Sequence, residues 1–135
     1  MGWFSKKSEI KYPFMEAYGR CEFEINGESY KTSNLRKLFK QFNVEPGGYH
    51  VLTALLQTDP GNPYDKNAVE VFIENLSVGY IPKTKAKKLA ILLENGPGKG
   101  YAQVGALIKY AEDAIGLSTV RLDMNWPPKF LSDSK

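Results

Sequence analysis

Three tyrosines and a run of lysines are the residues of this chain best suited to contact a polyanion. Tyr30, Tyr64 and Tyr80 lie at the ends of predicted strands, where an exposed ring can stack on a nucleic-acid base. Four lysines lie between residues 83 and 88, at the start of a predicted helix whose backbone N–H groups also favour anions. This arrangement suits phosphate groups, although the same lysines also fit an ordinary solvated helix face.

Catalytic chemistry has weaker support in the residues. Cys21 and His50 could form a nucleophile and base, but each lies in an apolar strand pattern that fits a structural role. Three aspartates could share a metal ion, namely Asp59, Asp65 and Asp123, but their spacing does not require it. The glycine-rich segment 96–100 lacks the terminal Lys-Ser/Thr of a phosphate-binding loop. We therefore expect a protein that is not an enzyme and holds no metal or cofactor.

The stretch from Gln57 to Lys83 must position the aromatic and basic residues. Two prolines, a glycine and several Asn and Asp residues fill positions 59–66, which predicts a rigid surface loop. Apolar and polar residues then alternate from Ala68 to Glu74, and a short turn at Asn75 leads into residues 78–81. This pattern predicts a β-hairpin that braces the loop.

Composition sets limits on the class of protein. The chain has 135 residues, the size of one domain, with 42% hydrophobic and 24% charged residues. Its net charge of +3 is compatible with nucleic acid but does not require it. One cysteine excludes an intramolecular disulfide, and one histidine argues against a zinc site. No apolar run is long enough to span a membrane, so we expect a cytoplasmic protein without membrane contact.

The remaining pattern predicts an α+β domain. Expected strands are Cys21–Tyr30, Tyr49–Leu56, Tyr101–Tyr110 and Ser118–Met124, with Gly116 in the last turn. Expected helices run from Thr32 or Ser33 to about Phe42, and from an N-cap at Thr84 to about Asn95. Antiparallel strands interrupted by two helices favour a small curved antiparallel sheet or an OB-like β-barrel.

The central stretch resembles the HIRAN domain family. The likeness is specific in Asn-Pro-Tyr-Asp-Lys-Asn-Ala-Val at 62–69 and in Val-Gly-Tyr-Ile-Pro at 78–82, and it extends more weakly from about Phe23 to Asp123. The family occurs as a module in Swi/Snf-type ATPases and as small stand-alone proteins. The resemblance implies a small barrel, here expected at residues 16–124, between an N-terminal arm at 1–15 and a C-terminal tail at 125–135.

The resemblance also implies a site for the 3′ end of single-stranded DNA. The family's Asn-x-Tyr-Asp loop contacts the terminal nucleotide, which assigns this role to Tyr64 and Asp65, preceded by Asn62. A carboxylate accepts a hydrogen bond from a free hydroxyl but repels a phosphate, so it selects an end over an internal linkage. The loop also has a purely structural interpretation, in which Asn62 and Asp65 cap turns and Tyr64 packs on the barrel.

Two further positions correspond to family contacts, and a third departs from the pattern. The ring after Val-Gly is Tyr80, and the lysine three positions later, which contacts phosphate in the family, is Lys83. After the first strand's glycine the family has an arginine and a tyrosine; this chain has Ser29 and Tyr30, with Lys31 adjacent. Ser29 therefore removes a fixed cationic fork from the implied site.

These observations predict a non-enzymatic module that binds single-stranded DNA, at 3′-hydroxyl ends formed in repair or at stalled forks. The alternative hypothesis is a protein-interaction module that docks a partner peptide through its aromatic loop. Salt distinguishes the two, because phosphate contacts make affinity fall steeply with ionic strength.

Overall fold

The computed structural model describes residues 12–113 and 117–132. In chain order its elements are β1 (Phe23–Glu24), the 3-10 helix η1 (Glu28–Tyr30), α2 (Thr32–Gln41), β2 (Tyr49–Thr58), β3 (Val69–Ile73), β4 (Leu76–Tyr80), α3 (Lys83–Glu94), β5 (Tyr101–Lys109) and β6 (Thr119–Asp123). The predicted α+β class, with a small curved antiparallel sheet and two α-helices in the described ranges, is confirmed.

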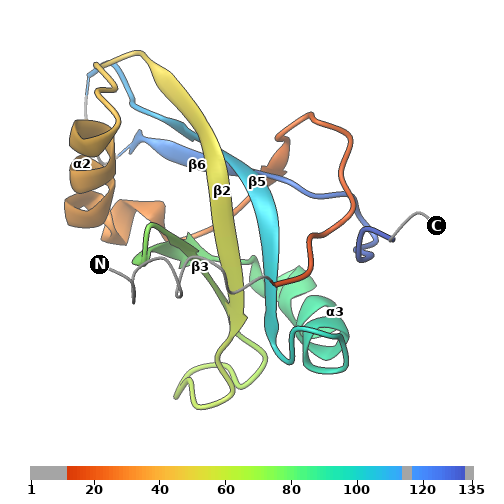
Figure 1. Cartoon of the computed structure of the whole chain (residues 1–135). Coiled ribbons are helices and arrows are strands. Elements are labelled where there is room, and N and C mark those ends of the chain that lie inside the picture. The colour runs from red at the N-terminus through yellow and green to blue at the C-terminus, as the bar shows by residue number, and fades with distance from the viewer. Residues whose placement is uncertain (1–11, 114–116, 133–135) are drawn as a thin grey trace, which may run out of the picture.

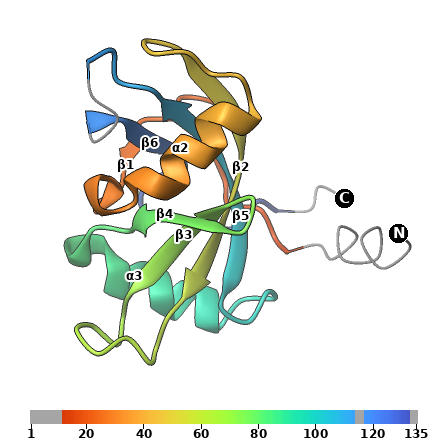
Figure 2. The same ribbon diagram turned by 90° about the vertical axis from the view of Figure 1, so that its left-hand side faces the viewer.

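One antiparallel sheet contains all six of these strands, in the order β1-β6-β5-β2-β3-β4. The long strands β2 and β5 run side by side and curve strongly, with α2 near the start of β2 and α3 near its end (Figure 1). After a quarter turn, α2 lies in front of the sheet, with β4 and β3 below it (Figure 2). The sheet therefore curls around a core into half a barrel.

The core forms where the inward faces of the sheet and both helices meet. Strand β5 alternates half-buried and buried residues along nearly its whole length, and β3 does the same from Val69 to Ile73. Helix α2 buries Leu35, Leu38 and Phe39, and α3 packs across β2, β3 and β5. Both helices were predicted from this apolar spacing. Neither is long and apolar enough to cross a membrane, within the ranges that the structure describes.

A backbone bridge joins the two edges of the curled sheet. Asn26, just beyond β1, exchanges two hydrogen bonds with Tyr80 at the end of β4, each 2.8 Å from nitrogen to oxygen. A bulge between Val71 and Phe72 in the β3–β4 register bends β4 toward this contact. Gly79 makes the approach possible, because a Cβ on it would lie 2.5 Å from the Asn26 carbonyl oxygen.

Segments on both sides of the strand-forming region pack against the sheet. The Tyr12 ring stacks on Tyr101 with centroids 4.9 Å apart, and Met15 is 3% exposed. After β6, Phe130 pairs with Met15, and its ring contacts the position of Gly96 at the end of α3. These contacts attach residues 12–15 and the start of the 125–135 segment to the rest of the domain.

The structure corrects three local expectations. The strand predicted at Cys21–Tyr30 is only two residues long, because Cys21 and Gly27 take positive φ values of 50° and 88° and interrupt the extended backbone. Thr84 does not cap α3, which begins at Lys83 with Pro82 as its N-cap. Helix α2 begins at Thr32 after an N-cap at Lys31, with no side-chain cap bond. The turn expected at Gly116 lies outside the described residues.

We expect Gly79→Ala to destabilise the protein by about 2–4 kcal/mol, because the added Cβ clashes with Asn26 and the φ of 151° is unfavourable for alanine. Urea unfolding of the variant measures this loss. Gly61→Ala is the matched control, since a Cβ there meets no atom within 4 Å. Equal stability of the two variants would contradict a close approach at Gly79.

Candidate nucleic-acid interface

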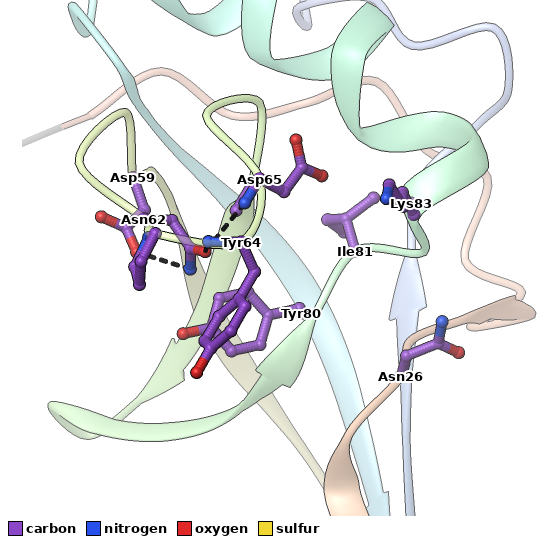
Figure 3. A pocket seen from close by; sticks show the side chains of 10 residues that line it. Asn26, Asp59, Asn62, Tyr64, Asp65, Tyr80, Ile81 and Lys83 are labelled. Atoms are coloured by element: carbon purple, nitrogen blue, oxygen red, sulfur yellow. Dashed lines mark hydrogen bonds between the residues drawn. The ribbon is translucent and has the colours of Figure 1, made fainter.

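A cavity of about 640 Å³ opens between the β2–β3 loop, the end of β4 and the start of α3. Its lining combines aromatic, acidic, amide and basic groups, shown close up in Figure 3. The residues that line it are Asn26, Asp59, Asn62, Pro63, Tyr64, Asp65, Ala68, Tyr80, Ile81 and Lys83. The backbone bridge between Asn26 and Tyr80 therefore forms one wall of the cavity, because both of its residues also line the cavity.

Asn62 holds the β2–β3 loop in shape. Its side-chain Oδ1 accepts hydrogen bonds from the backbone N–H groups of Tyr64 and Asp65, at 2.9 and 3.1 Å. Its Nδ2 donates to Asp59 Oδ2 at 3.2 Å, and the two bonding directions are visible in Figure 3. The Asn62 side chain thus makes the hydrogen bonds that a backbone carbonyl makes in an ordinary turn, and these bonds fix the main chain at Tyr64 and Asp65.

The fixed loop presents Tyr64 and Asp65 in different ways. The Tyr64 side chain is 91% exposed, so its ring packs little on the barrel and is open to a ligand. Asp65 Oδ1 accepts the Asn67 backbone N–H at 2.9 Å. Its carboxylate lies on the side of the cavity that also holds Ile81 and Lys83 (Figure 3). Asp65 therefore does cap a turn, as the structural interpretation expected. Only its Oδ1 is used for this, so Asp65 Oδ2 has no hydrogen-bond donor in the described part of the chain.

Tyr80 provides a second ring, held more firmly by the hairpin. It pairs with Glu70 across the β3–β4 ladder. Burial, then the negative charges of Glu70 and Asp59, and a hydrogen bond with Glu70 raise the pKa of the Tyr80 hydroxyl above its usual value of 10.0. Tyr80 therefore remains a neutral phenol at physiological pH, which preserves its hydroxyl and adds no negative charge to the cavity.

Two lysines supply positive charge at or near the cavity. Lys83 is the first residue of α3 and lines the cavity with an exposed side chain. Lys31 Nζ lies 5.8 Å from the centroid of the Tyr80 ring, within cation–π range. Tyr30, next to Lys31, is 89% exposed at the end of η1 and is not among the residues that line the cavity. Lys87 and Lys88 are exposed, and neither lines this cavity.

The structure thus brings together five of the seven residues proposed from the sequence. Asn62, Tyr64, Asp65, Tyr80 and Lys83 share the cavity, while Lys31 reaches its edge through Tyr80 and Tyr30 stays outside. Sequence reasoning missed Asn26, Pro63, Ala68 and Ile81, and it weighed Asp59 only as a metal ligand. The two motif segments could have flagged Pro63, Ala68 and Ile81, which lie inside them. No local signal places Asn26 here, since it arrives by long-range pairing with Tyr80.

Catalytic and metal hypotheses gain no geometric support from the described residues. His50 stacks on Phe42 with centroids 4.6 Å apart, and neither cavity lined by Cys21 includes it. Burial and then the Asp123 charge raise the pKa of the Cys21 thiol, which disfavours the reactive thiolate. Asp59 and Asp65 line one cavity and Asp123 another, and no cluster of three metal-ligating side chains occurs within residues 12–113 and 117–132.

Comparisons with known proteins identify a family likeness. A family model described as the HIRAN domain matches residues 18–118. A crystal structure of a protein from Lactobacillus plantarum, a structural genomics target, is 21% identical and gives a TM-score of 0.47. That alignment covers 80% of this chain and 93% of the other. No curated protein matches the chain.

We predict that Asn62→Ala loosens the loop while the domain stays folded. Loss of both Oδ1 bonds should lower the opening free energy at the Tyr64 and Asp65 amides by about 1–3 kcal/mol, measured by hydrogen exchange. Asn67→Ala is the control, because only the Asn67 backbone bonds to Asp65. Unchanged exchange in Asn62→Ala would show that the loop does not depend on this side chain.

Proposed function

This chain belongs to the HIRAN domain family, a family of nucleic-acid-binding modules, and we propose that its cavity binds the free 3′-hydroxyl end of single-stranded DNA. The observation that supports this most is the convergence of Tyr64, Asp65, Tyr80 and Lys83 on one cavity. A stacking surface, a hydroxyl acceptor and a phosphate-binding cation are the three groups needed to hold a terminal nucleotide. Such ends form during repair and at stalled forks, and this context is part of the proposal.

The rings of Tyr64 and Tyr80 supply the surfaces for the bases. Both line the cavity, one from the loop and one from the hairpin, and Figure 3 shows them on the same side of it. Base stacking on an aromatic side chain contributes about 1–3 kcal/mol per base and tolerates any base. The proposed site therefore selects single strands, whose bases are free to stack, with little dependence on sequence.

Asp65 supplies the preference for an end. Its Oδ1 is occupied by the Asn67 N–H, so Oδ2 is the atom that remains to accept a 3′-hydroxyl. A 3′-phosphate, or the next phosphate of a continuing strand, would place a second negative group beside this carboxylate. Such a placement costs free energy, because like charges in a confined site repel and neither is fully solvated.

Lys83 and Lys31 supply the positive charge for the phosphate that precedes the terminal nucleotide. Lys83 lines the cavity together with Tyr80, and Lys31 Nζ lies 5.8 Å from the centroid of the Tyr80 ring. A serine at position 29 leaves the site without the family's guanidinium fork, and flexible ammonium groups replace it. We therefore infer a binding module of moderate affinity and high salt sensitivity, which acts by binding rather than by catalysis.

We expect Asp65→Ala to reduce the discrimination between two otherwise identical oligonucleotides, one with a 3′-hydroxyl and one with a 3′-phosphate. The intact protein should prefer the hydroxyl by about 1–3 kcal/mol, as a hydrogen bond to a charged group contributes. Fluorescence anisotropy of 5′-labelled oligonucleotides measures both affinities. Asp65→Asn, which keeps an acceptor but removes the charge, should recover binding of the phosphorylated end. Equal binding of the two ends by the intact protein would exclude end recognition.

Lys83→Glu should weaken oligonucleotide binding of every sequence and lower the salt slope, d log K/d log[salt], by about 0.7 in magnitude, as for one lost single-strand phosphate contact. The matched control is Lys88→Glu, which makes the same charge change on the exposed side of α3. Binding that does not respond to salt in the intact protein would instead favour a partner peptide as the ligand. Equal effects of the two variants would show that only net charge matters.

A further inference from the structure

Trp126 and Lys85 form an aromatic and cationic pair two residues along α3 from Lys83. Trp126 lies beyond residues 18–118, which the family model matches. Trp126 follows β6 and is half-buried; its ring lies 5.6 Å from that of Phe23. Lys85 Nζ lies 5.5 Å from the centroid of the indole. An aromatic plane with an ammonium above it combines the two contacts that single-stranded nucleic acid uses, a stacked base and a neutralised phosphate.

A second cavity, of about 260 Å³, lies against Trp126 and is lined by aromatic, basic and acidic side chains. Arg20 and Tyr18 line it, and both side chains are exposed. Asp123 and the exposed Glu22 also line it. Asp123 Oδ1 accepts hydrogen bonds from the backbone N–H groups of Gly19 and Arg20, at 2.9 and 3.2 Å. These two bonds partly offset the negative charge that a phosphate would meet there.

Two elements connect the second cavity to the proposed 3′-end site. The segment from Arg20 to Asn26 has Arg20 in the second cavity and Asn26 in the first, with Phe23 between them against Trp126. The first turn of α3 carries Lys83 at the first cavity and Lys85 at Trp126. Residues two apart in a helix face different sides, so a strand that contacts both Lys83 and Lys85 crosses the start of α3.

We propose that Trp126 and Lys85 form a second subsite, which binds nucleotides on the 5′ side of the terminal one. The strand leaves the cavity past Lys83, crosses the start of α3 beside Phe23, and stacks a base at Trp126 with its phosphate at Lys85. This inference rests on the proposed binding of a 3′ end, and it adds a preference for longer single strands. A dinucleotide occupies the first cavity alone.

Tryptophan fluorescence tests the proposal directly. The chain has 2 tryptophans, so Trp3→Phe leaves Trp126 as the only one. A 3′-hydroxyl thymidylate oligomer of about eight nucleotides, within the site size of a small barrel, should quench Trp126 emission as it binds. Dithymidylate at saturation should not. The second subsite would be overturned if Trp126 emission stays unchanged while anisotropy shows that the longer oligomer is bound. It would also be overturned if the longer oligomer and dithymidylate quench the emission equally. Binding of neither oligomer would overturn the 3′-end site itself.

Two variants separate a binding role from a structural one. Trp126→Leu should weaken the affinity for the longer oligomer by about 5- to 100-fold, the range expected for one lost stacked base. The affinity for dithymidylate should stay unchanged. If this variant also loses dithymidylate binding, Lys85→Gln decides, since the lysine can change without emptying the space beside Phe23. The Lys85→Gln variant should lower the magnitude of the salt slope by about 0.7, and only for the longer oligomer. Lys87→Gln, on another side of α3, is its control, and equal effects of both would contradict the subsite.

Discussion

The two hydrogen bonds between Asn26 and Tyr80 are the contact on which the rest of this structure depends. They join the edges of a sheet that would otherwise stay open, and they require the main chain at Gly79 to pass where no Cβ fits. Because Tyr80 ends β4 and α3 begins at Lys83, the same closure fixes the start of the helix beside the β2–β3 loop. The closure of the sheet and the candidate site are therefore one structural feature, so a side chain added at Gly79 would disturb both.

The loop adds a second constraint, which is conformational entropy. A ligand that orders a flexible loop must offset the free energy of that ordering. Here Asn62 already holds the backbone at Tyr64 and Asp65, and the Tyr80 ring is set by the β3–β4 ladder. The groups proposed to meet the ligand are thus arranged before it binds. The exposed side chains of Tyr64 and Lys83 and the half-buried Lys31 remain to be ordered, which suits a small domain with few cations.

The sequence predicted the elements whose signals are local. Apolar spacing located both helices, alternation located β3, and the Asn-Pro-Tyr-Asp loop indicated where Tyr64 and Asp65 gather with Lys83. Long-range pairing left no such signal. Asn26 enters the cavity because the sheet curls, and Tyr30 leaves it because Gly27 turns the chain into η1. Trp126 was overlooked because it lies in a proline-containing segment after the last strand, where periodicity carries no information.

The central claim is that nucleic acid binds where the sheet closes. Backbone amide shifts in a ¹⁵N-labelled sample, titrated with a short 3′-hydroxyl oligonucleotide, test it most directly. The account predicts that the largest changes occur at Asn62 and residues 64–66, at Tyr80 and Ile81, and at Asn26 across the bridge. Changes confined to the outward face of β2, β5 and β6, around Tyr49 and Arg121, with none at the closing bridge, would contradict it.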